Sequence, residues 1–155
     1  MDFIYQEPYP ILKDETQYKK LTSDFVKTEL FGEREILTVD PKALELLAQE
    51  AMNDVSFMLR TTHLQKLKNI LDDPEASDND RFVAYNLLQN AVVAVAGQLP
   101  SCQDTGTAIV MAKKGENVYT GVDDGEYLSK GIFNTYQNKN LRYSQIIPIS
   151  MFEEK

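Results

Sequence analysis

Hydrophobic and polar positions follow two different periods in the first third of the chain. Between residues 24 and 39, two short runs of apolar and β-branched residues flank Phe31-Gly32-Glu33, which predicts a β-hairpin. Asp40 and Pro41 then predict a helix start, because aspartate can cap the first free N–H groups and proline suits the first helical position. Apolar residues recur after them at three- and four-residue steps, as on one face of an amphipathic helix: Leu44, Leu47, Ala48, Ala51, Val55, Met58 and Leu59.

A shorter helix is expected from about His63 to Leu71. Four residues would face inward on it: Leu64, Leu67, Ile70 and Leu71. The polar run DDPEASDND follows as a linker. Within it, Ser77 and Asp80 have the spacing of a capping box, with aspartate in place of the usual glutamate.

The capping pair predicts a third helix. Its apolar positions are Val83, Leu87, Leu88, Ala91, Ala94 and Val95, and Gly97 is placed as the C′ residue that ends it. The last two turns, AVVAVA, are apolar nearly all round. Because a helix that is apolar on every side is normally buried, this helix is predicted to be the most buried one.

The second half of the chain predicts another hairpin, a helix and an extended end. TAIVMA and NVYTGV flank Lys114-Gly115-Glu116 as two strands would, and residues 125–137 read as a helix with Leu128, Ile132 and Tyr136 on one face. The end contains Pro148 and is expected to be extended. No further predicted element could cover its seven apolar residues, so either this end docks as a strand or the natural chain continues. The seven are Leu141, Tyr143, Ile146, Ile147, Ile149, Met151 and Phe152.

Together these elements predict an α+β fold in which helices pack on short antiparallel strands and hairpins, with residues 1–155 in a single domain.

Charge and composition exclude several partners. The net charge is −8, with 16 basic against 24 acidic residues and no cluster of lysine and arginine, so we expect no nucleic-acid partner. No apolar run approaches the roughly 20 residues that span a bilayer, so we expect no membrane partner. The N-terminus lacks the pattern of a signal peptide, and one cysteine cannot form an internal disulfide. A cytoplasmic location is therefore expected.

The only cysteine, Cys102, lies in the polar sequence LPSCQDTGT, where a buried helix is predicted to end. A single cysteine is often a small buried hydrophobe, but polar neighbours favour a function here. One possibility is a thiol nucleophile with His63 as base and Asp104 as orienting group, although no spacing links His63 to Cys102. The other is metal ligation, for which one thiolate cannot supply a complete iron–sulfur site. The residues alone leave both possibilities open.

Several motifs resemble class I, iron–sulfur-dependent fumarate hydratase. They are LPSCQDTGTAIVMAKKGE, DPEASDND and GIFNTYQNKNLRYSQIIPISMFEE, with FIYQEPYPILKDETQYKKLTS and EILTVDPKALELLAQEAMNDVSFMLR nearer the start, so the resemblance covers nearly the whole chain. The α subunits of L-tartrate dehydratase share the cysteine loop, but the N-terminal match favours the fumarase.

The resemblance implies a hydro-lyase that interconverts fumarate and S-malate by reversible hydration. In that family a [4Fe-4S] cluster is held by three cysteines, and its fourth iron acts as a Lewis acid toward the substrate. Cys102 would be the first of the three ligands. Gln103 and Asp104 would face the dicarboxylate, and Arg142 would clamp one substrate carboxylate, a task suited to a planar bidentate donor. The resemblance also implies a homodimer.

Family members are several times longer, and the other two cysteines and the base would lie beyond residue 155. We therefore expect the chain to be an N-terminal fragment that binds no stable cluster and has no hydratase activity by itself, and no catalytic residue is assigned within it. A non-catalytic interaction module with a buried Cys102 remains the alternative outside enzymes. Fast alkylation of the thiol would favour an exposed ligand loop, and protection would favour the buried cysteine.

Overall fold

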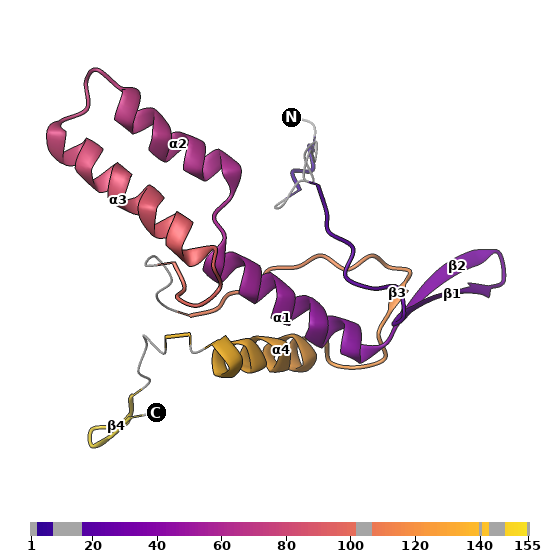
Figure 1. The fold of residues 1–155 in the computed structure, drawn as a ribbon. Coiled ribbons are helices and arrows are strands. Elements are labelled where there is room, and N and C mark those ends of the chain that lie inside the picture. The colour runs from indigo at the N-terminus through magenta and orange to yellow at the C-terminus, as the bar shows by residue number, and fades with distance from the viewer. Residues whose placement is uncertain (1–2, 8–16, 102–106, 140, 143–147, 155) are drawn as a thin grey trace.

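The computed structural model describes residues 3–7, 17–101, 107–139, 141–142 and 148–154. Along the chain the elements are β1 (Val26–Phe31), β2 (Arg34–Val39), α1 (Pro41–Phe57), α2 (Thr61–Asp72), α3 (Asp78–Ala94), β3 (Val118–Tyr119), α4 (Asp124–Lys139), β4 (Pro148–Ser150) and β5 (Glu153–Glu154). Figure 1 shows the α1–α4 pair in the centre, the β1–β2 hairpin at one end and the α2–α3 pair at the other. The mixed content confirms the predicted α+β class.

The first hairpin and the start of α1 are as predicted. β1 and β2 pair antiparallel in register from Val26–Val39 to Phe31–Arg34, and Gly32 between them has a φ of 64°. That left-handed conformation costs glycine little, which is why the turn lies there. Asp40 caps α1 by accepting a hydrogen bond of 2.9 Å from the N–H of Lys42.

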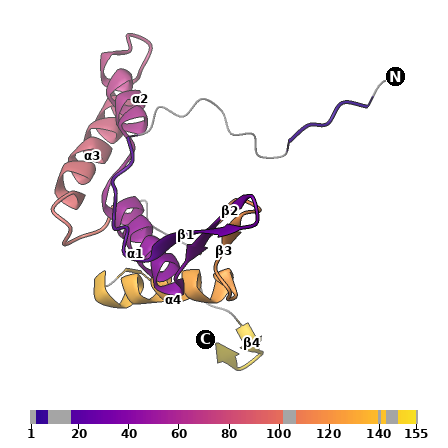
Figure 2. The same cartoon turned by 90° about the vertical axis from the view of Figure 1, so that its right-hand side faces the viewer.

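α1 and α4 pack side by side and run in the same direction, as Figures 1 and 2 both show. Gly131 faces Ala48, and a β-carbon at Gly131 would lie only 2.7 Å from the β-carbon of Ala48. The hydroxyl of Thr135 donates to the carbonyl of Gln49 at 3.2 Å. At the same interface Glu45 pairs with Lys130 at 2.9 Å and raises the pKa of that lysine. Small residues at the contact therefore allow close backbone approach, with polar groups bonded at its edge.

α2 and α3 pack against each other and run in opposite directions (Figure 1). Ser77 and Asp80 make both hydrogen bonds of the predicted capping box. Inward placement of the α2 residues is confirmed, since Leu67 is buried and its neighbours on that face are half-buried: Leu64, Ile70 and Leu71. α2 is slightly longer than predicted, beginning at Thr61 and ending at Asp72.

The prediction that α3 would be the most buried helix is wrong. Its inner face contains the buried Ala84 and Ala94, but Val92 is 74% exposed and two further valines of the AVVAVA run, Val93 and Val95, are also exposed. The reason is that α3 contacts α2 along one side, and no other described element covers its opposite side. The helix ends at Ala94 with Val95 as its cap, so Gly97, with a φ of 74°, lies one position beyond the predicted C′ place.

The prediction of a second hairpin is also wrong. Residues 107–112 form no strand, and β3 pairs in parallel with β2, with Leu37 opposite Val118 and Thr38 opposite Tyr119. Isolated apolar runs cannot distinguish hairpin partners from a segment that joins an existing sheet. α4 extends beyond the predicted 125–137 to residues 124–139. The chain end is extended as expected, with β4 paired antiparallel to β5, and Met151 and Phe152 between them are exposed.

Candidate functional site

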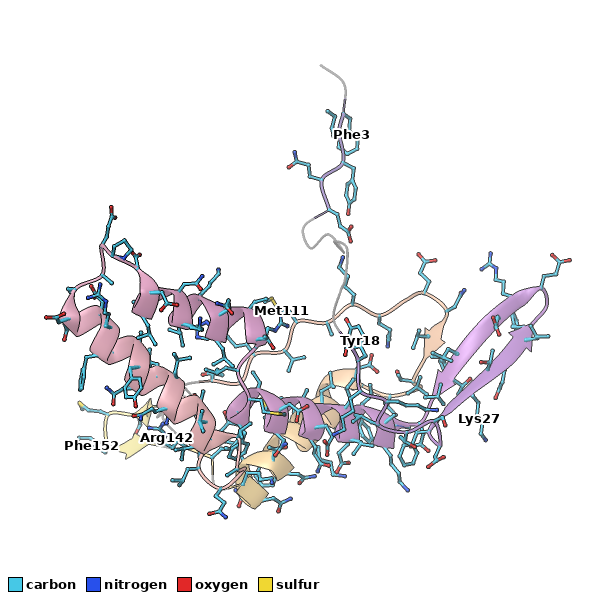
Figure 3. The ribbon with its side chains drawn as sticks, turned by 45° about the horizontal axis from the view of Figure 1, so that its top comes forward. Phe3, Tyr18, Lys27, Met111, Arg142 and Phe152 are labelled. Carbon is cyan, nitrogen blue, oxygen red and sulfur yellow. The ribbon has the colours of Figure 1, made fainter. Side chains whose placement is uncertain are left out.

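The predicted site residues divide into those the structure describes and those it does not. Cys102, Gln103 and Asp104 lie outside the described residues. Arg142 is described and exposed, three residues after the end of α4. Figure 3 shows Arg142 at the opposite end of the molecule from Lys27 of the β1–β2 hairpin. The described parts of the predicted site are therefore the residues that flank the cysteine loop and the segment that carries Arg142.

The entry to the cysteine loop is fixed to the end of α1. The N–H of Ser101 donates to the carbonyl of Ser56 at 2.8 Å, and both residues are buried. The hydroxyl of Ser101 lies 3.5 Å from the side-chain oxygen of Asn90 on α3, and the hydroxyl of Ser56 donates to the carbonyl of Met52 at 2.7 Å. Because buried N–H and carbonyl groups are costly when unpaired, this contact holds the residue before Cys102 at a defined position.

The segment that carries Arg142 leads back to the same end of α1. The ammonium of Lys139, in the last turn of α4, lies 5.7 Å from the centroid of the Phe57 ring, within cation–π range. Leu141 is only 3% exposed, and its N–H donates to the carbonyl of Tyr136 at 3.2 Å. A buried residue directly before Arg142 restricts where the guanidinium can reach.

Ser56 and Phe57 are adjacent, so two segments about 40 residues apart in sequence meet at one helix end. One segment leads directly into Cys102 and the other into Arg142. The structure thus brings together the segment before Cys102, the predicted cluster ligand, and the segment before Arg142, the predicted carboxylate-binding residue. We call the set Ser56, Phe57, Ser101, Lys139 and Leu141 the α1-end anchor.

Sequence reasoning missed the anchor role of Ser56. A serine within the apolar run Val55 to Met58 was the available signal, since a hydroxyl there needs a partner such as the carbonyl four residues earlier. Gly131 and Thr135, four residues apart on α4, gave a similar signal of a close helix contact.

His63, the candidate base of a thiol nucleophile, is exposed in the first turn of α2. Its supposed partners, Cys102 and Asp104, lie outside the described residues. That role therefore stays a prediction. Among the described residues, no group of three or more histidine, cysteine, aspartate or glutamate side chains could hold a metal ion.

A second polar cluster fixes the strand β3 to the start of α4. The carboxylate of Asp124 accepts hydrogen bonds from Lys114 and from the buried hydroxyl of Thr120, and these bonds, that of Lys114 foremost, lower the pKa of Asp124. Asp123 accepts from the N–H of Gly125 at 2.9 Å at the same helix start. Every charge here has a partner, which is typical of a structural cluster.

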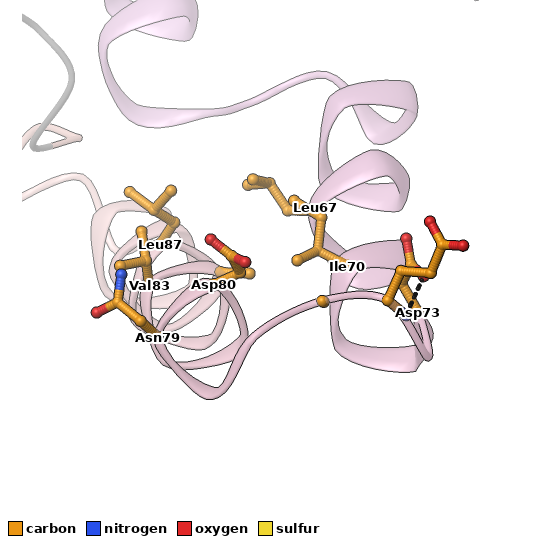
Figure 4. Close-up of a pocket in the computed structure, with 10 residues that line it drawn as sticks. Leu67, Ile70, Asp73, Asn79, Asp80, Val83 and Leu87 are labelled. Carbon is orange, nitrogen blue, oxygen red and sulfur yellow. Dashed lines mark hydrogen bonds between the residues drawn. The ribbon is translucent and has the colours of Figure 1, made fainter.

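The described cavities lie away from the α1-end anchor. The cavity between α2 and α3, about 530 Å³, has Leu67, Ile70 and Leu87 on its walls and acidic residues on its rim. Figure 4 shows Asp73 and Asp80 on opposite sides of this opening. Carboxylates at the rim would repel a dicarboxylate anion. Two smaller cavities, about 490 and 320 Å³, adjoin β3, one bordered by Lys114 and the other by Lys27.

Comparison with known proteins shows the family to which the chain belongs. The family described as fumarate hydratase (Fumerase) matches residues 45–155. The chain belongs to the fumarate hydratase family. Of the longer members, the anaerobic class I fumarate hydratase of Escherichia coli K12 is 54% identical over 152 residues, and the aerobic class I enzyme of that strain is 52% identical over the same length. Mitochondrial fumarate hydratase 1 of Leishmania major is 50% identical over 143 residues.

These matches cover 91–98% of the chain but only 26–28% of each of the three relatives. The chain thus corresponds to about a quarter of a fumarate hydratase of that length. The motif-based resemblance to this family is confirmed. None of the described helices is both long and apolar enough to cross a bilayer.

Proposed function

We propose that the chain supplies one wall of the active site of a cytoplasmic, iron–sulfur-dependent hydro-lyase that interconverts fumarate and S-malate. The observation that carries the proposal is the α1-end anchor, which holds the segments leading into Cys102 and into Arg142 at adjacent residues of one helix end. Family membership gives those two segments their chemistry.

Cys102 would act as one thiolate ligand of a [4Fe-4S] cluster. With one cysteine in the sequence, the chain can contribute to a cluster but cannot complete one with its own cysteines. When bound, the cluster supplies a Lewis acid for the hydroxyl group that is added or removed. The remaining ligands, and the partner copy of a homodimer, would come from outside these 155 residues.

Arg142 would bind one carboxylate of the substrate through two parallel hydrogen bonds, and Gln103 and Asp104 would face the rest of it. The buried Leu141 before Arg142 limits the positions of the guanidinium, so the arginine would orient the dicarboxylate as well as attract it. A local arginine can bind an anion although the chain carries a net charge of −8. Salt limits the range over which the acidic residues repel that anion to about 8 Å.

The test uses a chimera in which this chain replaces its matched region in the anaerobic Escherichia coli relative. Cys102→Ser should lose stoichiometric cluster absorbance together with fumarate hydration. Arg142→Lys should keep the cluster and lower kcat/KM for fumarate at least about tenfold, because lysine lacks the bidentate geometry. Full activity in either variant would refute the corresponding role. L-tartrate serves as the comparison substrate and should turn over more slowly than S-malate.

The isolated chain provides the complementary experiment. After anaerobic reconstitution with iron and sulfide, it should bind no stoichiometric [4Fe-4S] cluster and should not hydrate fumarate. A stable cluster with turnover in a single chain would contradict the proposed sharing of ligands.

A further inference from the structure

α3 has two faces, and only one of them is covered. Ala84 and Ala94 are buried on the inner face, toward α2. On the opposite side, helical spacing places five residues together, and we call them the outer face of α3: Phe82, Tyr85, Gln89, Val92 and Val93. Phe82 is 67% exposed, and Tyr85, Gln89 and both valines are also exposed. Large apolar side chains therefore lie in solvent along three turns of helix.

The outer face also lacks charge. No aspartate, glutamate, lysine or arginine occurs from residue 82 to residue 103, in a chain of which 26% of the residues are charged. A helix that faces water on one side normally has charged residues there, whereas one that is uncharged all round is normally buried. From residue 82 onward the composition of α3 is thus that of a covered helix, and the observed exposure of this part identifies a surface that another polypeptide should cover.

The exposed area of the whole chain is also large. The chain exposes 13090 Å², against roughly 8,000 Å² for a compact monomer of this mass. The excess of about 5,000 Å² is several times the roughly 800 Å² that each partner buries in a standard two-protein interface. The relatives are long enough to supply a larger partner, since 152 matched residues are 28% of the anaerobic Escherichia coli protein.

We propose that the outer face of α3 packs against the part of a fumarate hydratase polypeptide that lies outside the region matched by this chain. The contacting surface of that partner is apolar and uncharged, because a buried unpaired charge is costly. The proposal concerns an interface and does not depend on the role of Cys102.

Hydroxyl-radical footprinting of Phe82 and Tyr85 tests the proposal, with rates normalised to the unfolded chain. The isolated chain is compared with the chimera described above. Both residues should be oxidised at least about fivefold more slowly in the chimera, because the partner excludes solvent from them. Equal rates in the two proteins would refute the proposal. A rate that falls with concentration in the isolated chain, together with a doubled mass, would instead assign the face to a second copy and refute it as well.

Two substitutions on the outer face and one elsewhere sharpen the test. Val92→Asp and Gln89→Glu each add one negative charge to the face, and Asn69→Asp adds the same charge to an exposed position of α2. The first two should restore fast oxidation of Tyr85 in the chimera, and Asn69→Asp should not. In the isolated chain all three should leave thermal unfolding unchanged, since each position is solvent-exposed.

Co-purification gives a readout that does not need a soluble chimera. The chain is co-expressed with the tagged remainder of the anaerobic Escherichia coli protein. The unmodified chain and Asn69→Asp should be retained, and retention of Val92→Asp and Gln89→Glu should fall at least about tenfold, as expected for a charge placed in an apolar contact. Retention of all four chains, or of none, would contradict the proposed interface.

Discussion

At the scale of single residues, the decisive contacts involve small side chains. Gly131 lets α4 approach α1 so closely that a β-carbon there would lie 2.3 Å from the carbonyl oxygen of Glu45. Ser56 and Ser101 join α1 to the cysteine loop through one buried backbone hydrogen bond. Neither contact involves a large hydrophobe, so each depends on geometry that a single extra atom or a lost donor can disturb.

Gly131→Ala should destabilise the chain although alanine is the better helix former. The added methyl group meets backbone atoms of α1, and overpacking of this kind costs about 1–3 kcal/mol. Urea unfolding of Gly131→Ala measures the loss, and Ser129→Ala, at an exposed position of the same helix, is the control. A Gly131→Ala chain as stable as the unmodified one would show that the helices can separate without cost.

Ser101→Pro should release the cysteine loop from α1. Proline has no N–H, so the buried carbonyl of Ser56 would lose its partner at a cost of about 1–3 kcal/mol. In the chimera, cluster content and thermal stability should both fall. Ser101→Ala keeps the N–H and should retain both properties. If the two variants behaved alike, the backbone bond would not position the loop.

At the scale of elements, the sequence predicted those features that depend only on residues close together in the chain. Asp40 with Pro41, and Ser77 with Asp80, each specify a helix start through neighbouring atoms, and both caps form. The pairing of β3 with β2 was not predictable, because Val118 and Leu37 meet only through the tertiary fold. The same limit applies to the α1-end anchor: the motifs named Cys102 and Arg142, but the convergence of their flanking segments on Ser56 and Phe57 is a tertiary result.

The capping box should make the start of α3 sensitive to acid. Hydrogen bonds from Ser77, with its side chain foremost, lower the pKa of Asp80, so the folded state favours the ionised carboxylate. This stabilisation is present above the usual aspartate pKa of about 3.9 and is lost as pH falls through the lowered folded value. The Asp80→Asn chain should be less stable than the unmodified chain at neutral pH and should lose less stability on acidification. Circular dichroism across that pH range measures both. Identical acid profiles would argue against the cap as the source.

At the scale of the whole molecule, the chain exposes more surface than a compact protein of its mass, and much of that surface is apolar. The helices form two separate pairs joined through the end of α1, with the hairpin at the far end (Figures 1 and 2). Such an arrangement buries few large side chains: among the described residues, the buried hydrophobic ones are Ala48, Phe57, Leu67, Ala84, Ala94 and Leu141. A small core of this kind gives modest stability to the isolated chain.

Self-association of the isolated chain should therefore depend on its net charge. At neutral pH the charge of −8 keeps copies apart, and this repulsion disappears near the isoelectric point of about 4.7. Light scattering should rise sharply as pH approaches that value. Val92→Asp removes apolar surface from the outer face of α3 and should reduce the rise, whereas Asn69→Asp should lower the pH of the rise without changing its height. Equal heights in all three chains would assign the association to another surface.

The absence of charge between residues 82 and 103 has a practical consequence for protein chemistry. Trypsin cleaves after lysine and arginine, and the first such residues on either side of this uncharged run are Arg81 and Lys113. A digest therefore releases the outer face of α3 and Cys102 on one peptide. A single mass spectrum can report oxidation of Tyr85 and alkylation of Cys102 in the same molecules, so solvent access at the helix and at the thiol can be correlated molecule by molecule.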